Sequence, residues 1–473
     1  MLYGDKAFDV QLPFLFSESE LVSYRHILSL SQLFEDLFGK RKLVFLEAEN
    51  SIEAISSIFS IIESGNIPML LDSNITDSTI VKLINSYNPG YVMLSKPRFL
   101  PNFEEVSTSD NRINLQLLEN SSSKANGVKN KELAVLIPTS GSTGSARYVK
   151  ISYANLISQS SSIGMYLGLS KESRTLTTLP ASYSYGFSIL NSYVRAGGQI
   201  LVSEKNSVNQ NYWELVDQNR INSLSGVPFH YKLWKKTGFF EHSLPHLKTL
   251  TVAGGSLETN LKIEYLNFAE KMKIKLFVMY GQTEATARIS YVPPEQLRQK
   301  ITSIGIPIPQ GNIEILDESG KIVEEPRRIG ELVYSGPNVT QGISENFNHL
   351  EVLDEHNTNL FTGDIGYFDE DRYFYVVGRK KRFAKINGRR LSLDEVENSL
   401  MEIGFESACQ SDDNKIFIFY VATENIGTPF DYLINQFRLL RSHLSFIQIS
   451  AIPRLPSGKI DYTSLMEQRE KRA

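Results

Sequence analysis

Three short stretches rich in Gly, Ser and Thr each follow an apolar segment of the chain. They are TSGSTGSARYVK at 139–150, AGGSL at 253–257 and YGQTE at 280–284. Loops of this kind expose backbone N–H groups and hydroxyls, which suit the oxygens of a polyphosphate. Because ligands bind beyond the carboxyl ends of the strands in open α/β sheets, we expect the three loops to share one site.

The first loop excludes two common nucleotide-binding motifs. Position 146 is Ala where the Walker pattern GxxxxGK[ST] requires Gly, and the dinucleotide pattern GxGxxG is absent. Taken alone, a Ser/Gly run could equally be a surface turn, and YGQTE could be a plain turn after a strand. A function therefore has to be inferred from the motifs together.

Five stretches, in this order, resemble the motifs of the adenylate-forming superfamily of acyl-CoA synthetases, nonribosomal-peptide adenylation domains and firefly luciferase. They are the loop at 139–150, YGQTE, TGD at 362–364, Gly378-Arg379 and RLPSGKID at 454–461. A chance match of all five in order is far less probable than any single match. The resemblance covers nearly the whole chain, and it implies an enzyme that uses ATP and Mg²⁺ to convert a carboxylic acid to an acyl-AMP.

The resemblance assigns nucleotide-binding roles to residues of each stretch. Tyr280 would stack on adenine, and Asp364, whose two oxygens suit a cis-diol, would accept hydrogen bonds from the ribose hydroxyls, with Arg379 beside it. The full predicted set for ATP is Thr139, Ser140, Gly141, Ser142, Thr143, Gly144, Arg147, Gly254, Gly255, Tyr280, Gly281, Asp364 and Arg379.

Three residues are implied to act in catalysis. Thr283 would contact the α-phosphate, and Glu284 would hold Mg²⁺, which prefers hard oxygen ligands. Lys459 would bridge the substrate carboxylate and the α-phosphate, where a mobile positive charge offsets the negative charge of the transition state.

The phosphate-binding loop departs from the family pattern at its end. Where the family has Pro-Lys-Gly, this chain has Ala146-Arg147-Tyr148. Arginine keeps the positive charge but presents a planar fork, so the contact with phosphate has a different geometry.

The segment LPASYSYGFS at 179–188 is predicted to border the acyl pocket. Tyr183 replaces a histidine common in the family, and it either gates the pocket or simply packs. No Asp or Glu occurs between Ser173 and Arg195, and a buried ammonium without a partner is costly, so we favour an acid without an α-amine. The predicted pocket residues are Tyr183, Tyr185, Gly226, Val227, Phe229 and Ala253.

A second step, transfer of the acyl group to a thiol, is predicted from GRKKRFAKING at 378–388. By resemblance, Lys381 is the hinge of a rotating C-terminal lid, and Lys385 and Gly388 approach a thiol tunnel, where a glycine allows close backbone approach. The alternative is a solvated basic ribbon with a turn at Asn387-Gly388. The acceptor would be CoA or the phosphopantetheine of a carrier protein. Two rival interpretations remain: transfer to an amine, and a nucleotide-binding protein without catalysis.

The chain before these motifs shows the alternation of strands and helices that an open α/β sheet requires. Apolar strands ending at Leu46 and Asp72 enclose a helix, expected to begin at Asn50 with Glu53 in a capping box, and this alternation predicts a parallel sheet covered by helices. From about Ile304 the pattern changes to short β-ribbons. We predict an α/β fold with a β-rich subdomain, divided into an adenylate-forming core at 1–379 and a small α/β lid at 380–473.

Composition limits the classes of partner and the cellular compartment that we expect for this protein. A chain of 473 residues predicts two or more domains, and a net charge of −4 gives no reason to expect nucleic acid as a partner. No stretch reaches membrane-spanning length, and the start MLYGDKAFDV lacks a secretory pattern. The single cysteine, Cys409, fits a cytoplasmic protein.

Overall fold

A computed structural model describes residues 13–470 of the chain, apart from several short segments. These are residues 19, 107–112, 122–126, 140–146, 352–358, 381, 387–388, 413–414, 422–426 and 455–459.

The N-terminal half contains an eight-stranded sheet with a parallel centre. Its order is β19-β9-β8-β4-β3-β5-β7-β6, in which β3 pairs in parallel with β4 and β5, and β4 pairs in parallel with β8. The strands are β3 (Leu43–Glu47), β4 (Ile67–Leu71), β5 (Tyr91–Leu94), β6 (Phe103–Glu105), β7 (Gln116–Asn120), β8 (Leu133–Pro138), β9 (Tyr148–Ser152) and β19 (Ile343–Ser344). The expected alternation of strands and helices is confirmed, with α2 (Ile52–Glu63) and α3 (Asp77–Tyr87) between the parallel strands.

The predicted start of the first of these helices was wrong by one residue. Ser51 is the N-cap of α2, and its side chain accepts a hydrogen bond from the backbone N–H of Ala54 at 3.1 Å. Asn50 instead uses its side-chain amide for a long-range contact, donating to the carbonyl of Leu179 at 3.1 Å. A side chain already engaged in tertiary packing is not free to cap the helix that follows.

A second layered unit follows along the chain. Its five-stranded sheet has the order β12-β13-β14-β15-β16, with β12, β13 and β14 parallel. The bounds are β12 (Ser223–Gly226), β13 (Thr249–Val252), β14 (Lys275–Tyr280), β15 (Ser290–Val292) and β16 (Ile306–Pro307). The helices of this region are α4 (Tyr153–Leu167), α5 (Ser184–Ala196), α6 (Tyr212–Gln218), α7 (Pro228–Lys236) and α8 (Thr259–Met272).

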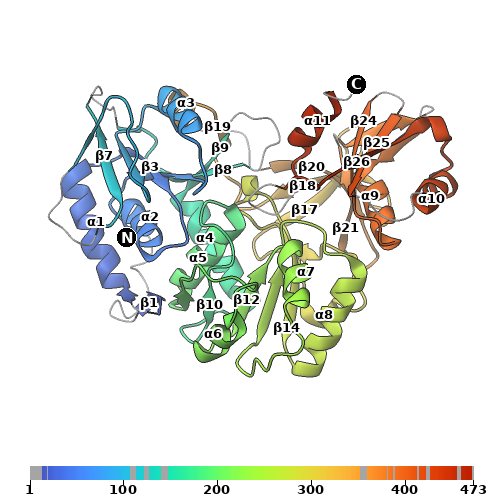
Figure 1. Cartoon of the computed structure of the whole chain (residues 1–473), viewed down its shortest axis with the longest axis horizontal. Coiled ribbons are helices and arrows are strands. Elements are labelled where there is room, and N and C mark those ends of the chain that lie inside the picture. The colour runs from blue at the N-terminus through green and yellow to red at the C-terminus, as the bar shows by residue number, and fades with distance from the viewer. Residues whose placement is uncertain are drawn as a thin grey trace.

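Helices α4 and α5 occupy the centre of the molecule (Figure 1). Their buried residues share one hydrophobic core with side chains of β3 in the first sheet and of β14 in the second. A smaller sheet, with the order β10-β11-β1-β2, lies alongside with α1 (Tyr24–Phe38). Its strands are β1 (Pro13–Phe16), β2 (Leu21–Ser23), β10 (Arg174–Leu176) and β11 (Gln199–Leu201). Strands β8 and β14 therefore belong to two different sheets, and a shared hydrophobic core fixes the position of one sheet relative to the other.

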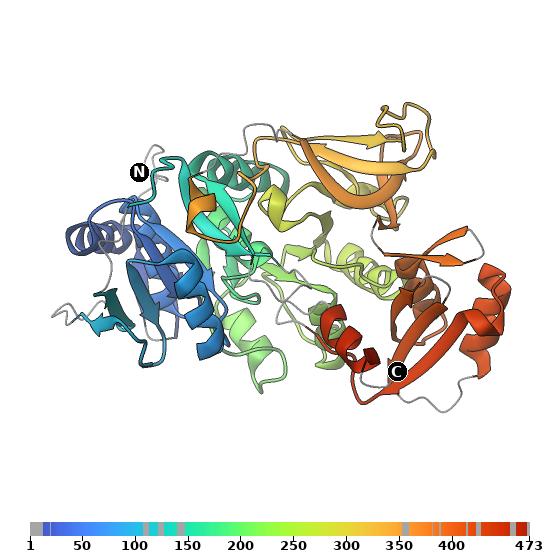
Figure 2. The same ribbon diagram turned by 90° about the horizontal axis from the view of Figure 1, so that it is seen from above.

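The chain from β17 onward has the β-rich character that the sequence predicts. An antiparallel sheet with the order β17-β18-β20-β21 is built from β17 (Asn312–Leu316), β18 (Gly330–Ser335), β20 (Asn359–Phe368) and β21 (Phe374–Arg379). It stands out as a separate yellow and orange layer in Figure 2.

Beyond β21 the polypeptide forms a smaller α/β unit at the end of the molecule opposite α1 (Figures 1 and 2). Its two hydrophobic cores contain only residues from Ala384 onward. Its elements are β22 (Phe383–Ile386), β23 (Arg389–Ser392), α9 (Leu393–Glu402), β24 (Ser407–Asp412), β25 (Lys415–Val421), α10 (Gly427–Phe437), β26 (Leu444–Ile449) and α11 (Tyr462–Glu470). The functional division into 1–379 and 380–473 stays a prediction.

Within the part of the chain that the structure describes, every helix is too short or too polar to cross a bilayer.

Candidate active site

Asp364 is the centre of the predicted nucleotide site. It lies on β20 directly opposite Arg379 of β21, and it is 4 % exposed. Its Oδ2 accepts a hydrogen bond from the hydroxyl of Tyr280, at the end of β14, and its Oδ1 lies 3.1 Å from Nε of Arg379. Three residues predicted to bind adenosine, separated by up to a hundred positions, therefore meet at one point.

The ionisation of this cluster is set by burial. Desolvation raises the pKa of Asp364, and the neighbouring Arg379 guanidinium opposes that rise. Burial and the Asp364 carboxylate together hold the pKa of Tyr280 well above its usual value. The phenol therefore stays protonated and donates to Asp364, so that the carboxylate is held in place by two donors.

The segment after Tyr280 turns back sharply on itself. Thr283 and Glu284 lie in a short 3-10 helix, and the two residues that follow Ala285, Thr286 and Ala287, have left-handed φ angles of 46° and 76°. This turn brings the carbonyl of Ala287 so close to Gly281 that a Cβ at position 281 would lie 2.1 Å from it. The glycine of YGQTE is therefore required by close backbone packing.

Thr283 connects this turn to the predicted acyl pocket. The residue is buried, and its hydroxyl lies 3.0 Å from the hydroxyl of Ser184, the first residue of α5. Ser184 lies between Tyr183 and Tyr185, so the predicted α-phosphate residue and the predicted pocket tyrosines adjoin. Glu284 is partly exposed, and its main-chain carbonyl accepts a hydrogen bond from Thr340 N–H at 3.0 Å.

The AGGSL loop packs against the same tyrosines. Gly254 has a φ of +81°, and a Cβ there would lie 2.4 Å from the hydroxyl of Tyr183 and 3.1 Å from Cγ1 of Val227. The rings of Tyr183 and Tyr185 meet edge to face with their centroids 6.4 Å apart. The hydroxyl of Tyr185 lies 2.8 Å from that of Thr251, at the end of β13. These contacts assemble part of the predicted pocket from α5, β13 and the loop after it.

The remaining pocket residues differ in exposure. Gly226, Val227 and Ala253 are buried, whereas the side chain of Phe229, on α7, is 47 % exposed. A contribution of Phe229 to a closed pocket wall stays a prediction.

The phosphate-binding loop is described only at its two ends. Ser140, Gly141, Ser142, Thr143 and Gly144 lie outside the described residues, while Thr139 N–H donates to the carbonyl of Arg147 at 2.8 Å. Nε of Arg147 lies 2.7 Å from Oε1 of Glu345, and both side chains are 46 % exposed. The sequence did not predict this ion pair, and a phosphate contact by Arg147 stays a prediction.

The predicted catalytic and hinge lysines cannot be placed. Lys459, Lys381 and Gly388 lie outside the described residues, and for Lys385 the structure describes the backbone alone, paired with Arg390 between β22 and β23.

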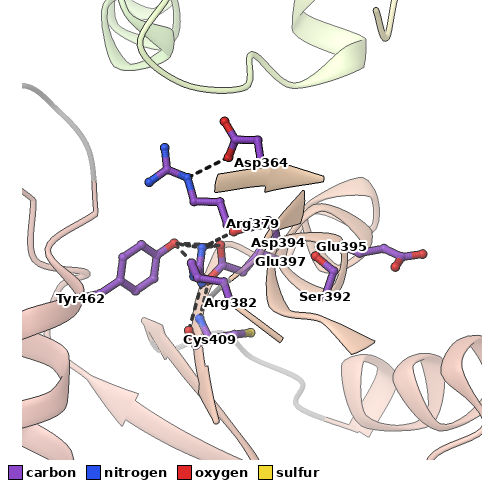
Figure 3. A network of polar contacts seen from close by, with 9 residues as sticks. All are labelled: Asp364, Arg379, Arg382, Ser392, Asp394, Glu395, Glu397, Cys409 and Tyr462. Carbon is purple, nitrogen blue, oxygen red and sulfur yellow. Dashed lines mark hydrogen bonds and ion pairs between the residues drawn. The ribbon is translucent and has the colours of Figure 1, made fainter. Parts of the chain in front are cut away.

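A polar network joins the predicted nucleotide site to the C-terminal unit (Figure 3). The backbone N–H of Arg379 donates to Oδ2 of Asp394, on α9, at 3.1 Å. Arg382 pairs with Asp394 and with Glu397, the latter at 2.7 Å, and its guanidinium carbon lies 3.9 Å from the ring centre of Tyr462. The sequence reasoning missed this network, although the basic run at 379–382 followed by the acidic LDEVE was a signal for it.

Arg288 is a second residue that sequence reasoning missed. It is 1 % exposed, its guanidinium carbon lies 4.3 Å from the ring centre of Tyr185, and its Nη1 donates to the carbonyl of Ala287 at 3.1 Å. Its Nε has no hydrogen-bond partner among the described residues. The signal in the sequence was a lone cation in the stretch ATARISYV, four residues after Glu284.

The surroundings of Arg288 do not neutralise its charge. Arginine cannot be deprotonated in a protein. Burial raises the pKa of Tyr166, whose hydroxyl accepts a hydrogen bond from the guanidinium, and the pKa of Tyr183 to about 12, so that both tyrosines remain neutral. A desolvated cation–π contact is worth about 2 kcal/mol, which is less than the several kcal/mol that burial of an unpaired ion costs.

Comparisons with known proteins identify the family. A family model described as AMP-binding enzyme matches residues 24–343, well over half of the chain. The chain belongs to this family. The predicted superfamily resemblance and the prediction of an AMP-binding enzyme are confirmed.

Curated relatives are similar along most of their length. This chain is 26% identical over 412 residues to 2-succinylbenzoate–CoA ligase of Oceanobacillus iheyensis, and the match covers 83% of this chain and 81% of that protein. It is 24% identical over 351 residues to 4-coumarate–CoA ligase-like 6 of Arabidopsis thaliana, covering 70% and 62%.

Solved structures confirm the predicted fold class. O-succinylbenzoate-CoA synthetase (MenE) of Bacillus subtilis, in complex with its acyl-adenylate intermediate, superposes with a TM-score of 0.76 at 21% identity, covering 96% of this chain and 95% of that one. ATP-bound MatB of Rhodopseudomonas palustris gives a TM-score of 0.79 at 18% identity, covering 99% and 98%.

Proposed function

We propose that this enzyme joins a carboxylic acid to CoA in two steps. An oxygen of the substrate carboxylate attacks the α-phosphorus of ATP, the bond to the β-phosphate oxygen breaks, and pyrophosphate leaves. The thiol sulfur then attacks the acyl carbon, its proton is lost to solvent, and AMP leaves. The observation that carries the proposal is the meeting of Tyr280, Asp364 and Arg379 beside the turn that holds Thr283.

Each of these residues has a role that its geometry supports. Asp364 accepts hydrogen bonds from the ribose hydroxyls while two protein donors hold it, and Tyr280 stacks on adenine. Thr283, buried against Ser184, is placed to contact the α-phosphate. Because the protein supplies positioning and charge stabilisation rather than covalent chemistry, small displacements of these groups should be costly.

The residues present fit a magnesium ion held mainly by phosphate oxygens. Within the described residues, no group of three or more His, Cys, Asp or Glu side chains could hold a metal by itself. Mg²⁺ usually binds through one or two carboxylates, waters and substrate phosphates, and Glu284 would supply that carboxylate. The ion would neutralise the phosphate charge that builds during attack.

The choice of thiol follows from the relatives. Those compared above include two named as CoA ligases, which favours CoA over the phosphopantetheine of a carrier protein as the acceptor. The absence of acidic residues between Ser173 and Arg195 favours an acid without an α-amine. We place the reaction in the cytoplasm, where both ATP and CoA are available.

ATP–pyrophosphate exchange over a panel of carboxylic acids tests the first step. The panel should include 2-succinylbenzoate and 4-coumarate, and we expect exchange that depends on the acid. Adding CoA, holo carrier protein or an amine, and identifying the product by mass spectrometry, tests the second step. Acyl-AMP that persists with both thiols would favour transfer to an amine, and ATP binding without exchange on any acid would favour a protein that has lost catalysis.

A further inference from the structure

Arg288 differs from other arginines with largely buried side chains in this molecule. Arg98 pairs with Glu47 at 2.7 Å, and Arg382 pairs with Glu397 at 2.7 Å and with Asp394. Arg41 donates to the main-chain carbonyls of residues 65, 128, 130 and 133. Arg288 contacts the carbonyl of its neighbour Ala287, the ring of Tyr185 and the hydroxyl of Tyr166, all of them neutral groups, and its Nε has no partner within the described residues.

The guanidinium of Arg288, which has no carboxylate partner among the described residues, lies beside residues of the predicted acyl pocket. The left-handed turn at Thr286 and Ala287 brings the chain back from the predicted nucleotide side. Arg288 then lies against Tyr185, whose neighbour Tyr183 packs on the Gly254 loop. The guanidinium of Arg288 thus lies among the predicted pocket tyrosines, while its backbone lies beside Gly281, the residue after Tyr280.

We propose that Arg288 binds a second carboxylate on the acid substrate, so that the enzyme activates dicarboxylic acids. This inference rests on the proposed function and narrows its substrate class. The planar guanidinium fork suits a carboxylate, and a cation that is already desolvated loses no further hydration when a charged partner binds it. Monoacids and diacids both carry the carboxylate that reacts with ATP. A preference for diacids must therefore come from a contact with the second carboxylate.

Non-hydrolysable acyl-AMP mimics separate this proposal from a purely structural role. Acyl-sulfamoyl adenosines would be prepared in matched pairs that end in a carboxylate or in its isosteric primary amide, with succinyl, glutaryl, adipoyl and 2-succinylbenzoyl chains. Binding would be measured by calorimetry without any turnover. We expect wild-type enzyme to bind the carboxylate member of at least one pair about 100-fold more tightly.

Variants assign the preference to the residue. Arg288→Gln should bind both members of the pair with the affinity that the wild type shows for the amide, and Arg288→Lys should keep part of the preference. Arg298→Gln is the matched control, since Arg298 is an exposed arginine paired with Glu270 at 2.6 Å, and it should retain the full preference. Binding of the amide compound by Arg288→Gln also shows that the variant is folded.

Two results would overturn the proposal. One is wild-type enzyme that binds the carboxylate and the amide equally in every pair, a result that needs no variant and leaves the proposed function intact. The other is Arg288→Gln that keeps the preference. Failure of wild-type enzyme to bind either member of any pair would instead refute the proposed function, and this proposal with it.

Discussion

Asp364 lies at the centre of the predicted adenosine site, and its partner Arg379 connects this site to the C-terminal unit. Its carboxylate accepts from Tyr280 and pairs with Arg379, while the backbone N–H of Arg379 donates to Asp394 on α9. A change at this one side chain should therefore alter both nucleotide binding and the link to the smaller unit.

We expect Asp364→Asn to weaken ATP binding by about 10- to 100-fold, because charge-assisted hydrogen bonds contribute about 1.5–3 kcal/mol. Calorimetric titration with ATP measures the loss. Asp371→Asn is the control, since Asp371 is a largely exposed aspartate at 70% side-chain exposure in the turn after β20. Equal affinities for the two variants would remove Asp364 from the nucleotide site.

The pKa of Asp364 adds a pH dependence to that prediction. Because burial raises this pKa, protonation on acidification begins at a higher pH than for an ordinary aspartate. The ionised form, which is predicted to accept hydrogen bonds from the ribose hydroxyls, is lost as pH falls through that raised value. The ATP affinity of the wild type should therefore decrease on mild acidification, and Asp364→Asn should lack this component.

Arg147 poses a different question, because its ion pair with Glu345 is half exposed. Exposed pairs contribute little to stability, so exchange of Glu345 for a phosphate would cost little. We expect Arg147→Gln to weaken ATP binding several-fold and Glu345→Gln to leave it unchanged or stronger, as measured by the same titration. If both variants bind ATP as the wild type does, the loop departs from the family in function as well as in sequence.

At the scale of elements, the loop after β13 packs against Tyr183, the N-cap residue of α5. Gly254 lies in the left-handed region, and a Cβ there would be 2.4 Å from the Tyr183 hydroxyl. At Gly255 a Cβ would meet only an ordinary contact, 3.4 Å from Cγ of Pro228. Neighbouring glycines of one loop thus have different packing requirements.

We expect Gly254→Ala to raise the KM for the acid at least tenfold, because the methyl group displaces Tyr183 and the left-handed backbone costs a further 1–2 kcal/mol, roughly. Gly255→Ala should change it little. Adding Tyr183→Phe to Gly254→Ala removes the clashing hydroxyl and should restore part of the affinity. Steady-state kinetics of adenylation measure all three, and equal effects of the two alanine variants would contradict this packing.

At the scale of the whole molecule, the C-terminal unit has its own hydrophobic cores and joins the nucleotide site through Arg379 and Asp394. A body with its own core can move as a unit, since its internal packing survives a change of orientation. This organisation favours the predicted lid, which rotates between acyl-AMP formation and transfer to the thiol.

We expect Lys459→Ala to reduce acyl-AMP formation by at least 100-fold, because it removes the positive charge predicted to stabilise the transition state. Thiol transfer from preformed acyl-AMP should be nearly unchanged. Single-turnover assays of each half-reaction supply the measurement. Equal losses in both would refute a role confined to the first step.

A substitution at the predicted hinge, Lys381, should instead impair the second step more than the first. Lys381→Pro restricts the backbone φ and should slow transfer to the thiol much more than adenylation, by about tenfold or more. Lys381→Ala, which leaves the backbone free, is the matched control. Slowing of both steps to the same extent would indicate a folding defect or a hinge elsewhere.

The sequence by itself determined the fold class, the family and the kinds of residue at the nucleotide site. Strand and helix patterns are local, and motifs such as YGQTE and TGD carry their chemistry within a few positions, so each can be read without the fold. Even so, local signals placed the start of α2 at Asn50, one residue before the observed N-cap Ser51, because both residue types can cap a helix.

Only the tertiary structure decided which of these residues meet. The contacts of Tyr280 with Asp364, of Ser184 with Thr283 and of Arg288 with Tyr185 join positions about a hundred apart, from different sheets and helices. No local pattern marks a cation as buried and unpaired, since burial and neutralisation depend on every element packed around it. The charge of Arg288 was visible in the sequence, but its lack of a carboxylate partner among the described residues became visible only in the folded chain.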